Sequence, residues 1–94
     1  MREKEIEKKL TQAVKCMGGL ALKFISPGYD GVPDRIVLFP GGRIAFVEVK
    51  APGEKPRPLQ LSRHRLLRRL GFRVYVLDAA EQIGGILDEI ESQL

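Results

Sequence analysis

Two apolar segments joined by a glycine-containing turn constrain the fold of this chain most. Residues 35–39 form a run rich in β-branched side chains, Pro40-Gly41-Gly42 turns the chain, and residues 43–51 run back. Such a pattern is typical of a β-hairpin. Both segments are apolar at successive positions instead of alternate ones, which is typical of strands buried on both faces. The hairpin therefore predicts a small central sheet with helices packed against it.

The rest of the chain supplies those helices and two further strands. Apolar residues at helical spacing predict three helices, and Asp78 with Glu81 three residues later is typical of a helix start. The expected order is α-β-β-β-α-β-α, a mixed sheet of about four strands in one α/β domain spanning residues 1–94. The first helix is ended by Gly18-Gly19, and the two further strands span residues 20–26 and 72–77. The second helix has Leu59, Leu66 and Leu70 facing inward and is ended by Gly71. The apolar face of the last helix consists of Ile83, Ile86, Leu87, Ile90 and Leu94.

Composition excludes several classes of protein. No stretch of the 94 residues approaches the roughly 18 apolar residues of a membrane-spanning helix, and the charged N-terminus is unlike a secretory signal. The single cysteine, Cys16, excludes an internal disulfide. With only one histidine, His64, the chain also lacks the ligands of a zinc finger and any motif of paired histidines. We therefore expect a cytoplasmic protein with no membrane contact.

The net charge of +4 is unevenly distributed. Residues 50–73 carry eight basic side chains and one acidic side chain, Glu54, whereas five acids and no bases follow from Asp78 onward. A basic block of this kind indicates a surface for a polyanion such as nucleic acid. The alternative is a solvated helix face.

Glu48 and Lys50 are the unexpected charges in the most apolar strand. They lie two residues apart, so their side chains share one face of the strand, with Cα atoms roughly 6.5 Å apart. Buried charges are costly unless they are paired or bound to a metal, and so they indicate a site. The alternative is a surface ion pair near the end of the strand.

Asp34, at the start of the preceding strand, is expected to join them. The hairpin folds Asp34 back toward Glu48 and Lys50. Two carboxylates, a backbone carbonyl such as that of Val49, waters and a substrate phosphate suit Mg²⁺. The lysine can position a water and neutralise charge on phosphorus. Asp34 alone is also typical of a residue that caps a strand start.

The length of the hairpin turn decides whether this site can form. With a two-residue turn at Gly41-Gly42, Asp34 lies opposite Val49 and faces away from Glu48. A three-residue turn drawn from residues 40–43 brings Asp34 to the face of Glu48, and such turns are frequent when glycine is present. We therefore expect a three-residue turn, or a bulge in the strand that follows Asp34.

The first helix offers a further carboxylate. At 100° per residue, Glu3 points nearest the apolar face and Glu7 lies at its flank. An acidic residue in this position either stabilises the helix dipole or belongs to the site.

Together these motifs resemble the PD-(D/E)XK nuclease superfamily and, within it, the small stand-alone VRR-NUC proteins that phages often encode. The resemblance spans nearly the whole chain. It is carried by Ser26-Pro27-Gly28, Gly31-Val32-Pro33-Asp34-Arg35, Pro40-Gly41-Gly42-Arg43, the segment Phe46-Val47-Glu48-Val49-Lys50-Ala51-Pro52-Gly53, Leu59-Gln60, and Leu70-Gly71-Phe72-Arg73-Val74.

The resemblance implies a restriction-endonuclease-like core and specific roles. Asp34 and Glu48 would be metal ligands for Mg²⁺ or Mn²⁺, and Lys50 the catalytic lysine. Glu3, or alternatively Glu7, would complete the acidic cluster. Gln60 matches a glutamine that recurs on the helix after the Glu-x-Lys strand, although it is otherwise an ordinary polar helix residue. The location implied is the cytoplasm of a bacterial or phage-infected cell.

The basic helix supplies the DNA contacts that we expect. Arginines contact phosphates without reading sequence, and the aromatic residues are too few for a stacking platform. A structure-selective endonuclease for branched or flapped DNA, such as a Holliday-junction resolvase, fits this pattern and needs no nucleotide cofactor. The expected nucleic-acid-binding residues are Arg35, Lys55, Arg57, Arg65, Arg68 and Arg69.

Paired incisions in a junction indicate a homodimer. Leu61, which points away from the apolar face of its helix, and Tyr29, in a loop, are candidates for burial by a partner. The alternative functions are a nuclease for specific duplex sequences, a non-catalytic nucleic-acid-binding protein on a nuclease-like core, and an interaction domain whose Glu48–Lys50 pair is structural.

Overall fold

The chain folds in the expected order of helices and strands, with one short 3-10 turn added. The computed structural model describes residues 1–93, so that Leu94, which we assigned to the apolar face of the last helix, lies outside the described residues. The elements are α1 (Glu3–Cys16), β1 (Leu20–Lys23), β2 (Arg35–Phe39), β3 (Arg43–Val49), α2 (Pro58–Arg69), β4 (Arg73–Leu77), the 3-10 turn η1 (Ala80–Gln82) and α3 (Ile83–Glu91).

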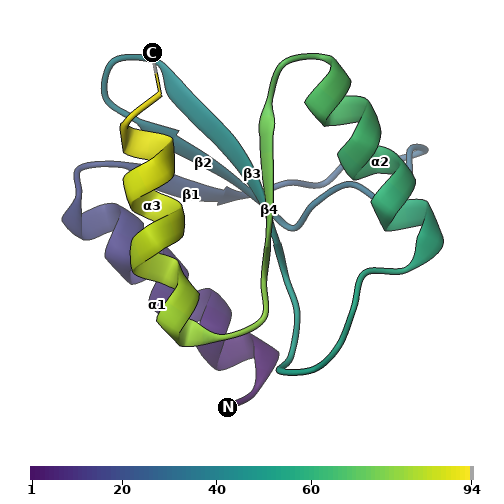
Figure 1. The fold of residues 1–94 in the computed structure, drawn as a ribbon, viewed down its shortest axis with the longest axis horizontal. Coiled ribbons are helices and arrows are strands. Elements are labelled where there is room, and N and C mark those ends of the chain that lie inside the picture. The colour runs from purple at the N-terminus through teal and green to yellow at the C-terminus, as the bar shows by residue number, and fades with distance from the viewer. Residues whose placement is uncertain (94) are drawn as a thin grey trace.

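The four strands form one mixed sheet in the order β1-β2-β3-β4. The first two pairings are antiparallel, whereas β3 and β4 run parallel because α2 carries the chain between them. Helices α1 and α3 lie on one side of the sheet and α2 on the other (Figure 1). The predicted α/β fold with a four-stranded mixed sheet is confirmed. Within residues 1–93, no helix has the length and apolar character needed to cross a membrane.

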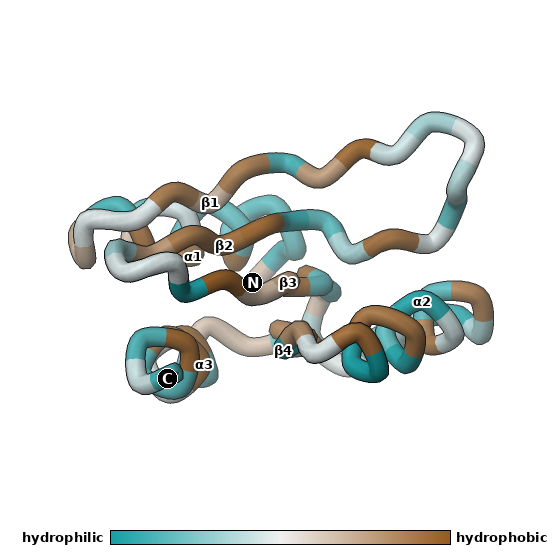
Figure 2. The backbone as a smooth tube through the Cα atoms, turned by 90° about the horizontal axis from the view of Figure 1, so that it is seen from above, coloured by the Kyte–Doolittle hydropathy of each residue, from teal (hydrophilic) through white to brown (hydrophobic). Residues whose placement is uncertain are grey.

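The hydrophobic core lies between the sheet and the pair α1 and α3. Ile6, Leu10 and Val14 of α1 are completely buried against it. The alternate strand positions Val37, Val47 and Val49 face the same core. The outer face of β1 is less well covered, because Leu20 and Leu22 remain 58% and 47% exposed. Figure 2 shows hydrophobic stretches along the strands and a mixture of hydrophobic and hydrophilic residues along the helices.

The hairpin between β2 and β3 has the predicted three-residue turn. Phe39 pairs with Arg43, which leaves Pro40, Gly41 and Gly42 as the turn. Gly41 and Gly42 have φ angles of +85° and +77°, a backbone region that side-chain-bearing residues seldom adopt. Arg35 pairs with Val47, so continuing the register by one residue brings Asp34 opposite Glu48. The turn therefore has the parity that a shared carboxylate site requires.

Several element boundaries differ from those expected. Strand β1 ends at Lys23 instead of residue 26, and β3 ends at Val49 instead of residue 51. The last helix begins at Ile83, so Gly84-Gly85 falls in its first turn. The expected helix start at Asp78 with Glu81 is wrong, because Ala79 is the residue that precedes η1 and the side chain of Gln82, not Glu81, accepts its backbone N–H.

The inward face of α2 is also different from the prediction. Leu59 and Leu70, expected to face inward, are 46% and 64% exposed. The buried residues of this helix are Gln60 and His64 instead. These two polar side chains lie on the same helix face because they are four residues apart. Their presence inside is explained by the buried carboxylate that they contact.

Candidate active site

Glu48 is a fully buried carboxylate on β3, with 1% of its surface exposed. Its Oε2 accepts a hydrogen bond from the Gln60 side-chain amide at 3.1 Å, and its Oε1 lies 3.3 Å from His64 Nε2. An ionised carboxylate is tolerated in such a position only when its oxygens are hydrogen-bonded. Helix α2 therefore holds Glu48 in one orientation.

Asp34 lies at the mouth of the same site, directly before β2. Its Oδ2 accepts a hydrogen bond from the Val49 backbone N–H at 2.7 Å, which ties it to β3. Burial, and to a smaller extent the negative charges of Glu48 and Glu3, together raise the pKa of Asp34 to about 6, against the opposing effect of the Val49 hydrogen bond. The neighbouring carboxylates Asp34 and Glu48 are thus brought to one place, as the hairpin parity predicted.

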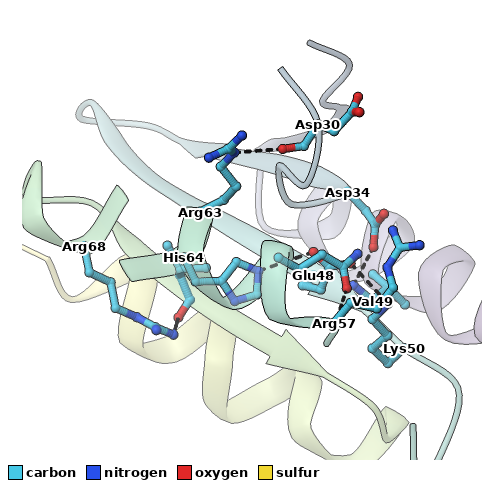
Figure 3. A network of polar contacts seen from close by, with 11 residues as sticks. Asp30, Asp34, Glu48, Val49, Lys50, Arg57, Arg63, His64 and Arg68 are labelled. Carbon is cyan, nitrogen blue, oxygen red and sulfur yellow. Dashed lines mark hydrogen bonds and ion pairs between the residues drawn. The ribbon is translucent and has the colours of Figure 1, made fainter. Parts of the chain in front are cut away.

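Lys50 completes the group at the end of β3. Its Nζ lies 3.7 Å from Glu48 Oε2, and its side chain is 13% exposed. The Lys50 backbone N–H donates to the carbonyl of Leu77, so β4 fixes the backbone that carries this side chain. Figure 3 shows Asp34, Glu48 and Lys50 in the same region of the molecule. Only part of the ammonium's hydrogen-bonding capacity is used within the protein, because it carries three donors.

Gln60 has two contacts that explain its position. Its side-chain carbonyl accepts the Arg57 backbone N–H at 2.8 Å at the N-terminus of α2, while its amide donates to Glu48. Gln60 thus stabilises the N-terminus of α2 and also hydrogen-bonds the carboxylate of Glu48. The structure therefore brings together Asp34, Glu48, Lys50 and Gln60, the residues of the hairpin and of the following helix that the family resemblance singled out.

His64 is the site residue that the sequence interpretation missed. It is completely buried, and its Nδ1 has no hydrogen-bond partner in the described part of the chain. Because a carboxylate oxygen accepts hydrogen bonds, the contact with Glu48 assigns a proton to Nε2 of the ring. The available signal was the spacing, because a residue four positions after Gln60 shares its helix face.

The two candidate glutamates of α1 have different surroundings. Glu7 forms an ion pair with the Arg35 guanidinium, whose Nη1 also donates to the Ala21 carbonyl. Glu3 is exposed but close enough for its charge to raise the pKa of Asp34. Arg35, expected to bind nucleic acid, instead uses several of its N–H groups to link Glu7 of α1 with the Ala21 carbonyl of β1. The choice between Glu3 and Glu7 as a site member stays a prediction.

The other expected DNA-binding residues lie on the loop before α2 and on α2 itself. Lys55, Arg57, Arg65 and Arg69 are exposed. Arg68 is also at the surface, but its Nη2 donates to the Val74 carbonyl at 2.7 Å. Apart from Arg68, the charged groups of these five residues form no side-chain hydrogen bond within the described residues and are open to solvent. Their role in binding nucleic acid stays a prediction.

A loop between β1 and β2 carries Asp34 and is held against α2. The Arg63 guanidinium stacks 3.8 Å from the centre of the Tyr29 ring, and its Nε donates to the Asp30 carbonyl at 2.7 Å. Gly31 has a φ of +89°, and a Cβ there would lie 2.9 Å from Leu59 Cγ. A side chain at residue 31 would therefore push this loop away from the helix.

The donor set fits a hard divalent cation. Mg²⁺ is commonly held by one or two carboxylates together with waters and substrate phosphate oxygens. Asp34 and Glu48 supply two such carboxylates, and a cation would relieve the charge crowding that contributes to the raised pKa of Asp34. Within residues 1–93 no group of three or more histidine, cysteine or acidic residues is arranged to hold a metal ion. The participation of the Val49 carbonyl stays a prediction.

Comparisons with known proteins agree on one family. Residues 1–81 match the model of the VRR-NUC domain. A protein of Acyrthosiphon pisum secondary endosymbiont phage 1, named "Putative nuclease p44", is 56% identical over 81 residues, which cover 86% of this chain and 87% of that protein. A solved VRR_NUC domain structure superposes with a TM-score of 0.85 at 33% identity, covering 92% of this chain and 94% of the other.

Proposed function

This chain belongs to the VRR-NUC family, and on that premise we propose that it is a divalent-metal-dependent endonuclease that hydrolyses phosphodiester bonds in branched DNA, such as four-way junctions. The nuclease assignment rests on the family. The observation that carries the metal dependence is the neighbouring pair Asp34 and Glu48, with Lys50 Nζ 3.7 Å from Glu48. Two carboxylates beside one lysine supply what phosphodiester hydrolysis needs, namely ligands for the cation and an ammonium group that donates hydrogen bonds to water or phosphate.

Hydrolysis adds one water across a P–O bond. The water oxygen bonds to phosphorus, the bond to the leaving sugar oxygen breaks, and that oxygen takes up a proton. Mg²⁺ or Mn²⁺ held by Asp34 and Glu48 would neutralise phosphate charge and make a bound water more acidic. Lys50 has donors free to hold the attacking water and a phosphate oxygen. Gln60 and His64 keep Glu48 in place through its two oxygens.

Branched DNA is proposed because the chain offers phosphate-binding cations without a module that reads bases. Arg57, Arg65 and Arg69 are exposed on α2 or at its start. Phosphate contacts provide affinity for any sequence. A homodimer would supply two such sites for the paired incisions of a junction.

The deciding experiment is a cleavage assay on matched DNA structures. End-labelled four-way junction, flap, duplex and single-stranded DNA are incubated with Mg²⁺, Mn²⁺ or EDTA. We expect metal-dependent cutting of the branched substrates and no cutting in EDTA. Asp88→Asn, which removes an exposed carboxylate from α3, serves as the matched control for Glu48→Gln. Equal cutting in EDTA would contradict metal dependence, and equal cutting of all four substrates would contradict structure selectivity.

A further inference from the structure

A second group of basic side chains lies outside the block that the sequence analysis identified. A surface pocket of about 330 Å³ opens between α1, the end of β1 and the start of β2. We refer to it as the lysine pocket. It is lined by Lys4, Glu7, Lys8, Thr11, Lys23 and Arg35.

The lining is strongly cationic. Lys4 and Lys8 are one helical turn apart on α1, and Lys23 ends β1 where it pairs with Arg35. Glu7 is the only acid of the lining, and it is bound to Arg35. No carboxylate in residues 1–93 forms an ion pair with any of the three lysines. Three solvated ammonium groups are therefore available to an anion.

The lysine pocket adjoins the candidate active site. A second pocket, of about 210 Å³, is lined by Glu7, Lys23, Phe24, Ile25 and Asp34. Glu7 and Lys23 are common to both pockets, so the two hollows form a continuous surface from Asp34 to α1. A linear polyanion with one phosphate at Asp34 and Glu48 would extend across its neighbouring surface.

We propose that Lys4, Lys8 and Lys23 form a subsite for the backbone phosphates of the DNA strand that flanks the scissile bond. This inference rests on the proposed function and adds phosphate contacts on the α1 side of the candidate active site. Lysine ammonium groups act as point charges on phosphates and carry no sequence information. Arg35, with its guanidinium engaged by Glu7 and Ala21, forms the fixed wall of the subsite.

The test measures DNA binding as a function of salt. Binding of a fluorescent duplex and a four-way junction is followed by anisotropy in EDTA at several NaCl concentrations. Each lost phosphate contact lowers the slope of log affinity against log salt by about 0.9 on duplex DNA. We expect Lys4→Gln with Lys8→Gln to lower the slope by about two and Lys23→Gln by about one, with affinity at low salt falling roughly tenfold for the double variant.

The matched control removes the same charge from the same helix. Lys9 and Lys15 are exposed residues of α1 outside the pocket lining. Lys9→Gln with Lys15→Gln is expected to leave the slope nearly unchanged. Equal losses for the two double variants would mean a general charge effect and would overturn the subsite, as would a wild-type protein that binds no DNA. If DNA binds but is never cut, the proposed function fails while the slopes still decide the subsite.

Discussion

His64 Nε2 lies 3.3 Å from Glu48 Oε1, and both side chains are almost entirely removed from solvent. Gln60 holds the other carboxylate oxygen at 3.1 Å. A carboxylate fixed at both oxygens keeps one orientation, and the proposed role of Glu48 as a metal ligand requires such support. His64 is thus a positioning residue for Glu48.

Replacing His64 by Gln or by Asn separates positioning from packing. The Gln amide reaches the place of Nε2, whereas the shorter Asn amide lies where Nδ1 sits and does not reach Glu48. We expect His64→Asn to lower unfolding free energy by about 1–3 kcal/mol and to lose most cleavage activity. His64→Gln is expected to regain much of that activity. Urea unfolding and junction cleavage at saturating Mg²⁺ measure the two effects, and equal activity of both variants would assign His64 a packing role only.

The inward face of α2 was predicted wrongly from hydrophobic periodicity, and the reason is specific to this site. The pattern of Leu59, Leu66 and Leu70 favours an apolar inward face because inward residues are usually apolar. Here the inward positions, Gln60 and His64, serve a buried carboxylate on another element. Once Glu48 was assigned to a buried strand, polar side chains facing it could be expected, because a buried carboxylate needs hydrogen-bond donors around it.

Asp34 predicts how stability changes with pH. Its pKa is raised to about 6 from an ordinary value of 3.8, chiefly by burial. A carboxyl whose folded-state pKa is raised adds stability below its unfolded-state pKa, and this stability is lost as pH rises through about 6. Asp34→Asn keeps an acceptor for the Val49 N–H and removes this charge. In EDTA we therefore expect Asp34→Asn to melt higher than wild type at pH 8, with the gain disappearing toward pH 4.

Added Mg²⁺ should reverse that order. A cation that binds the folded protein raises its melting temperature, and the wild type has the carboxylate that Asp34→Asn lacks. Differential scanning fluorimetry with a Mg²⁺ titration at pH 8 measures this. A melting temperature that rises equally in both proteins would exclude Asp34 from the cation site.

The hairpin parity could be predicted, whereas the partner of Glu7 could not. Side chains alternate along strands, so the turn length alone decides that Asp34 faces Glu48. A helical projection gives only the direction of Glu7 around α1. Its ion pair with Arg35 joins residues 28 apart in sequence and depends on how α1 lies on the sheet. Tertiary packing of this kind leaves no periodic signal in one sequence.

The charged pair at the end of β3 predicts the strongest losses of activity. Lys50→Met keeps most of the side-chain stem but removes the ammonium, and Glu48→Gln keeps the shape of the carboxylate. We expect each to reduce the cleavage rate by roughly a hundredfold or more, the usual cost of losing one positioned electrostatic group. Single-turnover cleavage measures this, and circular dichroism checks the fold. A Glu48→Gln protein with the wild-type rate would refute the metal-ligand role.

Gly31 tests whether the loop before Asp34 must pack against α2. Gly31 and Gly28 have φ angles of +89° and +79°, so alanine is strained by about 1–2 kcal/mol at either position. Only at residue 31 would the new Cβ also meet Leu59 Cγ and Arg63 Cγ, at 2.9 and 3.2 Å. We expect Gly31→Ala to lower the melting temperature more than Gly28→Ala and to reduce cleavage. Equal effects of the two variants would show that the contact with α2 is unimportant.

A homodimer is expected to bury Tyr29 and Leu61. Each is 40% exposed, as the sequence predicted, and small domains gain apolar burial by association. Paired incisions need two sites related by a two-fold axis, so each copy would present the same surface to the other. Light scattering at tens of micromolar is expected to give twice the chain mass of 10.5 kDa, and Leu61→Glu to shift it toward the monomer. Glu91→Lys, an exposed charge reversal on α3, is the control and should leave the dimer intact. A wild-type protein that is monomeric at this concentration and still cuts both strands of a junction would show that two copies are not needed.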